Sequence, residues 1–218
     1  RVIRVPEDIQ DVVEAEKAEW DMWAMKRLAK PQKLNSLTFE QWLNSNRTYR
    51  QVVKRCPAIN DLSGKRVLDI GGTCTQSVMM LRSGIDRLDQ LEISPVSQHL
   101  AVKNLNASGL DWEGRVLFHT VPAEKLPFCD DTFDVVFALA TIHHVRRPDV
   151  WGEIHRVLKP GGIVLLYEAW VHHWWVKFMP LWRWVRRVEG GTDNPLSVLD
   201  IRAMEKLFPD VWHYPFGF

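Results

Sequence analysis

The chain has 218 residues, a net charge of +1, an apolar fraction of 46% and a charged fraction of 25%. This composition is normal for a globular protein of one domain with an added segment. The small net charge gives no electrostatic reason to expect a nucleic-acid partner, and no apolar run reaches the length of a transmembrane span. Three widely spaced cysteines form neither a disulfide framework nor a zinc motif, so we expect a cytoplasmic location and no metal site.

The first 60 residues are predicted to form an N-terminal helical extension. Residues 8–30 mix apolar and charged side chains at helical spacing and are followed by Pro31. Residues 38–55 repeat this pattern ahead of Pro57. We interpret the two helices as a lid or docking arm that precedes a main domain at residues 61–218.

From Ser63 onward, short apolar strands alternate with helices. Strands are predicted at residues 65–70, 87–93, 116–120, 133–140 and 163–167. Helices are predicted between them, at residues 75–83, 95–108 and 150–158. Such alternation implies parallel βαβ units. The sequence therefore predicts an α/β fold with a Rossmann-like, doubly wound and mostly parallel sheet.

A tryptophan-rich segment interrupts this domain. Five of the 11 tryptophans lie between Trp170 and Trp184. If residues 169–188 are helical, aromatic side chains fall on one arc, basic side chains lie mostly opposite, and Pro180 kinks the helix. Aromatic and basic faces are typical of a helix at a membrane interface. Alternatively, the aromatic face packs on the domain and covers an acceptor pocket, or it binds a protein partner.

The remaining residues predict one more helix and one more strand. Ser197 is a suitable N-cap for a helix at residues 198–208. Residues 211–218 are predicted to form a sixth strand.

Two residues at predicted strand ends indicate a cofactor that contains a nucleoside. Gly71 follows the first strand, where a glycine lets the backbone approach a ligand closely. Glu92 ends the second strand, 21 residues after Gly71, and a carboxylate at this spacing can accept hydrogen bonds from both ribose hydroxyls. These two residues alone do not separate a nicotinamide dinucleotide from S-adenosylmethionine.

Five motifs between Ser63 and Glu168 make that distinction. In chain order they are Val67-Leu68-Asp69-Ile70-Gly71, Leu91-Glu92-Ile93-Ser94-Pro95, residues 123–136, Ile142-His143-His144-Val145 and residues 153–162. Their order and spacing resemble the class I, S-adenosylmethionine-dependent methyltransferases that act on small molecules and are related to the ubiquinone-pathway enzymes. A nicotinamide-dependent reductase has little support, because no Gly-x-Gly-x-x-Gly follows the first strand.

The resemblance implies a role for each cofactor-binding residue. The first loop would line the methionine end of the cofactor, Glu92 would hold the ribose, and Ala138 would lie beneath the reactive methyl group. Ile93, Ala123 and Glu124 would border the adenine. The implied cofactor-binding set is Asp69, Gly71, Gly72, Thr73, Glu92, Ile93, Ala123, Glu124 and Ala138.

The sequence departs from the family pattern in two loops. Thr73 and Thr75 stand where the family has its second and third glycines, and β-branched residues disfavour a positive φ. Pro122 replaces an aspartate that often contacts the adenine amine, and proline has neither a carboxylate nor an N–H. The family also closes its sheet with a seventh strand, for which no residues remain after 218. These departures favour an alternative, a methyltransferase-like subunit without catalysis that holds a membrane-associated complex together.

His143 and His144 follow the fourth strand, where an acceptor would approach. A neutral imidazole can take a proton from a hydroxyl, so either histidine is a candidate general base. The competing interpretation is that one histidine packs against the loop and the other faces water. Methyl transfer can also proceed without a general base. We therefore expect methyl transfer to a small apolar or lipid-linked acceptor, with residues 169–188 contacting a membrane surface.

Overall fold

The computed structural model describes residues 7–30, 34–45, 49–145, 147–168 and 195–214. Five parallel strands form one sheet in the order β3-β2-β1-β4-β5. Their bounds are β1 (Arg66–Ile70), β2 (Arg87–Leu91), β3 (Val116–His119), β4 (Phe133–Leu139) and β5 (Leu158–Tyr167). The strand order reverses direction between β1 and β4, which makes the carboxyl edge at that point the expected place for a ligand. The predicted Rossmann-like fold is confirmed.

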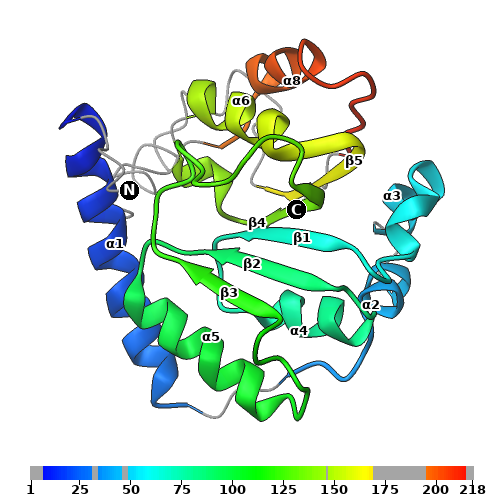
Figure 1. Cartoon of the computed structure of the whole chain (residues 1–218). Helices are drawn as coiled ribbons and strands as arrows, with labels where there is room; N and C mark the ends of the chain where they lie inside the picture. Colours follow the sequence, from blue (N-terminus) through cyan, green and yellow to red (C-terminus); the bar gives the residue numbers. More distant parts are fainter. Residues whose placement is uncertain (1–6, 31–33, 46–48, 146, 169–194, 215–218) are drawn as a thin grey trace, which may run out of the picture.

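Helices cover both faces of the sheet (Figure 1). One face carries α4 (Thr75–Arg82) and α5 (Pro95–Ala107), and the other carries α6 (Arg147–Val157) and α8 (Val198–Glu205). Side chains of β4 alternate between the two cores, as the period of a strand requires. Val135 and Phe137 pack with α4, whereas Val136 and Ala138 pack with α6. The near-continuous apolar runs in the sequence arise because both faces are covered.

The N-terminal helices lie at opposite ends of the strands (Figure 1). Helix α1 (Glu7–Leu28) packs against α5 beside the carboxyl ends of the strands. Helices α2 (Phe39–Ser45) and α3 (Tyr49–Arg55), followed by the short helix η1 (Pro57–Asn60), lie beside the amino ends of the strands. Within residues 38–55 the structure describes two helices rather than the single helix that was predicted, and residues 46–48 lie outside the described residues. In the last turn of α2, Asn44 and Ser45 donate side-chain hydrogen bonds to backbone carbonyls, at 2.8 Å each.

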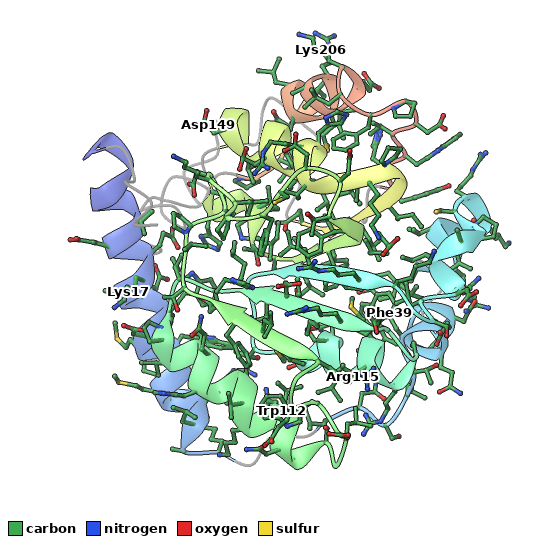
Figure 2. The ribbon with its side chains drawn as sticks, in the orientation of Figure 1. Lys17, Phe39, Trp112, Arg115, Asp149 and Lys206 are labelled. Carbon is green, nitrogen blue, oxygen red and sulfur yellow. The ribbon has the colours of Figure 1, made fainter. Side chains whose placement is uncertain are left out.

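Phe39 joins the N-terminal extension to the core of the main domain (Figure 2). Its side chain is fully buried between α2 and the sheet, and its ring meets Phe137 of β4 edge to face at 5.7 Å between centroids. Its backbone N–H donates to the Ser83 hydroxyl at 2.9 Å. We expect Phe39→Ala to lower the free energy of unfolding by about 4 kcal/mol, because it leaves a large cavity. Urea denaturation measures this. Leu199→Ala is the control, because Leu199 is 72% exposed and its truncation should stay within about 0.5 kcal/mol.

The predicted strand at residues 211–218 is wrong for its described part. Residues 211–214 form no strand. Trp212 instead lies beneath the Arg55 guanidinium at 4.4 Å from the ring centroid, and the Tyr214 hydroxyl accepts a hydrogen bond from Arg55 Nε at 3.3 Å. These contacts hold the chain against α3 rather than alongside β5. Residues 215–218 and the tryptophan-rich segment 169–188 lie outside the described residues.

Candidate active site

A cavity of about 430 Å³ lies at the carboxyl ends of the strands, between the sheet and α1. Of the residues predicted to bind a cofactor, those that line it are Gly71, Gly72, Thr73, Glu92, Ile93, Ala123 and Glu124. Helix α1 contributes Val13, Glu16, Trp20, Trp23 and Arg27. Asp69 and Ala138 are not among the described lining residues. Both are buried, Ala138 in the core shared with α6, and the wall after β4 is formed by Leu139, Ala140 and Thr141 instead.

The loop after β1 adopts its unusual backbone without straining the two threonines. Among the described residues, positive φ angles in this loop occur at Gly71, Gly72 and Cys74, with values of 80°, 89° and 58°. Thr75 is already the first residue of α4. Among the described residues of the loop, Cys74 is therefore the non-glycine residue with a left-handed backbone, which lowers the stability of the folded state by about 1 kcal/mol. The conformational objection to Thr73 and Thr75 does not apply.

Two buried amides hold this loop, and the sequence analysis missed both. Gln90 Nε2 donates to the carbonyl of Gly72 at 2.8 Å, and Asn104 Nδ2 donates to the carbonyl of Thr73 at 2.7 Å. Gln90 and Asn104 are each at most 1% exposed. A glutamine inside an otherwise buried strand was the available signal, because a buried amide needs a defined partner.

Glu92, which lines the cavity, and Asp69, which does not, are both buried carboxylates. Glu92 accepts hydrogen bonds from the backbone N–H of Gly72 at 3.1 Å and of Ser94 at 2.9 Å, and Asp69 accepts one from the Ser77 hydroxyl. Burial raises the pKa of Glu92 to about 7, although these backbone donors lower it. Burial likewise raises the pKa of Asp69 to about 7, and the charge of Glu92 adds to that rise.

These raised pKa values predict that stability falls as pH rises. Both carboxyls keep protons in the folded chain that the unfolded chain releases near pH 4. Their stabilising contribution is therefore complete below about pH 4 and is lost as pH rises through about 7. We expect the free energy of unfolding of the ligand-free protein, measured by urea denaturation, to decrease from about pH 5 to about pH 8.

Glu92→Gln should flatten that profile, because it removes one titrating group and one negative neighbour of Asp69. Glu113→Gln, at an exposed position, should leave the profile as it is. A wild-type stability that is flat or increases over this range would contradict the assignment.

Glu168 fixes the turn after β4, although no sequence motif pointed to it. One of its oxygens accepts from the backbone N–H groups of Thr141 and Ile142 at 3.0 and 2.9 Å, and the other lies 2.7 Å from His143 Nδ1. Its side chain is 3% exposed. Glu168 directly follows β5, as Glu92 directly follows β2, so an acidic residue at a strand end was the signal available.

The two candidate histidines have different surroundings. His143 is buried, is tied to Glu168 and is not among the described residues that line the cavity. His144 lines the cavity, and its Nδ1 lies 3.3 Å from Glu16 Oε1 of α1. The two rings pack at 4.2 Å between centroids. Of the two, His144 is the histidine that a ligand in the cavity would meet.

In the part of the chain that the structure describes, no three His, Cys, Asp or Glu side chains gather closely enough to hold a metal ion. None of its helices combines the length and the apolar character needed to cross a bilayer.

Comparisons with known proteins show that this chain is similar to methyltransferases. Residues 68–166 match the family model described as a methyltransferase domain. A 27-O-demethylrifamycin SV methyltransferase of Amycolatopsis mediterranei is 37% identical over 108 residues, covering 48% of this chain and 38% of that protein. A demethylmenaquinone methyltransferase of Streptomyces avermitilis is 30% identical over 138 residues, covering 62% and 54%. The chain thus spans about half, or less, of the length of these relatives.

The fold of a solved structure agrees. A putative sarcosine dimethylglycine methyltransferase from Galdieria sulphuraria superposes with a TM-score of 0.62 over 77% of this chain and 60% of its own. Because the two are 18% identical, this likeness concerns the fold alone.

Proposed function

Because the chain carries a class I, S-adenosylmethionine-dependent methyltransferase domain, related to the enzymes of the ubiquinone and menaquinone pathways, we propose that it methylates a small apolar or lipid-linked acceptor. S-adenosylmethionine is the methyl donor of this family. The observation that carries the proposal is the position of Glu92. Its buried carboxylate lines the cavity at the end of β2, where it would accept hydrogen bonds from the two ribose hydroxyls of the donor.

The residues around the cavity fit such a donor. Gly71 and Gly72 bring backbone to the cavity wall without side chains. A Cβ at Gly71 would collide with the side chain of Thr141, so the loop after β1 and the turn after β4 approach each other only because glycine stands there. Ile93 and Ala123 supply apolar surface for an adenine ring. When bound, the donor supplies an electrophilic methyl group, and the protein would hold and desolvate the reactants.

The apolar part of the cavity lining supports an apolar acceptor. The described lining includes Trp20, Val121, Leu139 and Val145. The two relatives are named for methylation of a 27-O-demethylrifamycin and of a demethylmenaquinone. The sequence of residues 169–188 supports a membrane contact, since its aromatic and basic residues suit a lipid interface. The loop geometry at Thr73 and Thr75 takes away one argument for a subunit without catalysis.

Two measurements test the methyltransferase proposal. Calorimetric titration with S-adenosylmethionine should show binding, and no binding by folded wild-type protein would contradict the activity itself. Transfer of labelled methyl groups to a demethylmenaquinol, a sterol and a hydroxylated macrocycle is then followed by organic extraction. We expect label in the organic phase for at least one of the three. Donor binding without transfer to any of them would reject this acceptor class.

The membrane contact is tested separately by sedimentation with vesicles of phosphatidylglycerol and phosphatidylcholine. We expect binding that weakens when Trp174 and Trp175 are both replaced by serine. Trp212→Ser is the matched control, because Trp212 is 57% exposed but lies outside the segment. Equal binding by all three proteins, or none by the wild type, would reject the contact.

A further inference from the structure

Glu16 is a buried carboxylate on a helix whose other acidic side chains nearby are exposed. Glu16 is 4% exposed, whereas Glu14 and Glu19 on the same helix are exposed. Removing a carboxylate from water is costly unless hydrogen bonds and charges compensate for it. Glu16 also lines the cavity. The partners of this side chain therefore indicate what it does there.

The two oxygens of Glu16 hold two rings in the cavity wall. Oε2 accepts a hydrogen bond from Trp20 Nε1 at 3.2 Å, one turn along α1. Oε1 lies 3.3 Å from Nδ1 of His144, which is 128 positions away in the sequence. The rings of Trp20 and His144 meet edge to face at 5.4 Å between centroids. Helix α1 thus fixes the orientation of the His144 imidazole by a hydrogen bond and by packing.

The hydrogen bond also selects a tautomer. When the Glu16 carboxylate is ionised it only accepts hydrogen bonds, and in that state Nδ1 of His144 would carry the proton of this contact. In the neutral imidazole the lone pair then resides on Nε2. His143 packs behind this ring and has its own carboxylate, Glu168, which also accepts backbone N–H groups of the turn. His143 therefore supports the turn, and His144 is the ring presented to a ligand.

We propose that Glu16 is a positioning residue that prepares His144 as the general base for acceptors bearing a hydroxyl group. The inference rests on the proposed function, because it concerns the same cavity. As the acceptor oxygen bonds to the methyl carbon, the carbon–sulfur bond breaks and its electron pair stays on sulfur. The hydroxyl proton passes to Nε2 of His144, and the carboxylate of Glu16 stabilises the resulting imidazolium. An imidazole base assists only an acceptor that loses a proton during transfer, as a hydroxyl group does when it becomes a methyl ether.

The test is nitrogen NMR of the full chain labelled with ¹⁵N-histidine, in the presence of S-adenosylhomocysteine at alkaline pH. His144→Gln assigns the signals by their loss. We expect a protonated Nδ1 and an unprotonated Nε2 in the wild type. Glu16→Met removes the acceptor at similar size and should move the proton of His144 toward Nε2. Glu19→Gln, an exposed change on the same helix, should leave the spectrum unchanged.

The outcomes separate this inference from the proposed function. A proton on Nε2 of wild-type His144 overturns the inference, and so does an unchanged spectrum in Glu16→Met. If Glu16→Met does not fold, the wild-type spectrum decides alone. Calorimetry on the same proteins, prepared without S-adenosylhomocysteine, should show S-adenosylmethionine affinities within a factor of about 3 of each other, because Glu16 is assigned to the acceptor. Failure of the wild type to bind the donor overturns the proposed function while the tautomer result stands.

A kinetic measurement adds a readout that a purely structural role would not change. With a hydroxyl acceptor found by the extraction assay, Glu16→Met and His144→Gln should each lower kcat by about 100-fold or more. The KM for the donor should change little. Wild-type rates in His144→Gln would overturn its assignment as the base.

Discussion

Glu92→Gln should weaken S-adenosylmethionine binding by about 100-fold while the protein stays folded. The carboxylate of Glu92 would accept hydrogen bonds from two ribose hydroxyls, and a hydrogen bond to a charged group contributes about 1.5–3 kcal/mol. A neutral amide keeps one acceptor oxygen and turns a donor toward the other hydroxyl. The expected loss of about 3 kcal/mol corresponds to the 100-fold change.

The fold should tolerate this substitution, because burial already disfavours the charge of Glu92. We expect the free energy of unfolding without ligand to change by about 1 kcal/mol at most. Calorimetry measures the affinity, and urea denaturation measures the stability. Glu113→Gln is the matched control, since Glu113 is exposed and does not line the cavity. Affinity within a factor of about 3 of the wild type would reject Glu92 as the ribose ligand.

Gly71→Ala should destabilise the protein far more than Gly72→Ala, although the two glycines are neighbours. Both have positive φ angles, 80° and 89°, so each alanine is strained by about 1–2 kcal/mol. At Gly71 the new Cβ would also lie 3.0 Å from Cβ of Thr141 and even closer to the outer atoms of that side chain. At Gly72 no heavy atom lies within 4 Å of the added Cβ. The difference between the two variants isolates the collision from the backbone strain.

We expect Gly71→Ala to lower the free energy of unfolding by about 4 kcal/mol and Gly72→Ala by about 1–2 kcal/mol. For a chain of this size, the first change lowers Tm by about 8–16 °C. Gly71→Ala combined with Thr141→Ala should recover part of the loss, because the second substitution removes the outer atoms of the colliding side chain. Equal destabilisation by the two single substitutions would show that the contact with Thr141 has no energetic importance.

The sequence predicted the sheet well because the signals for it are local. Apolar residues dominate β4 and the second half of β5, and the helices between the strands begin and end at recognisable residues such as Ser94, the N-cap of α5. Gly71 and Glu92 were also identifiable, since each lies at a strand end with a fixed spacing. A parallel sheet brings such ends together whatever the rest of the chain does.

The missed residues act through contacts that no local pattern encodes. Glu16 reaches His144 across 128 positions, and Glu168 reaches the turn after β4 across 25 to 27 positions. On the sequence, Glu16 is one of several acidic residues in a charged helix. The wrong strand at residues 211–214 has a similar origin, because its aromatic residues pack on Arg55 rather than on the sheet.

The docking of α1 has a consequence for the order in which the protein is made. Helix α1 is synthesised before its partners: Ser94, which donates to Asp21, and His144 both come much later in the chain, and contacts between distant positions form slowly. The βαβ units can assemble before α1 settles over them. A helix that packs on the outside of the sheet domain undocks at a lower cost in free energy than a strand inside the sheet does. We therefore expect hydrogen exchange to be faster in α1 than in β1 or β4. We also expect ligands to enter the cavity when α1 undocks.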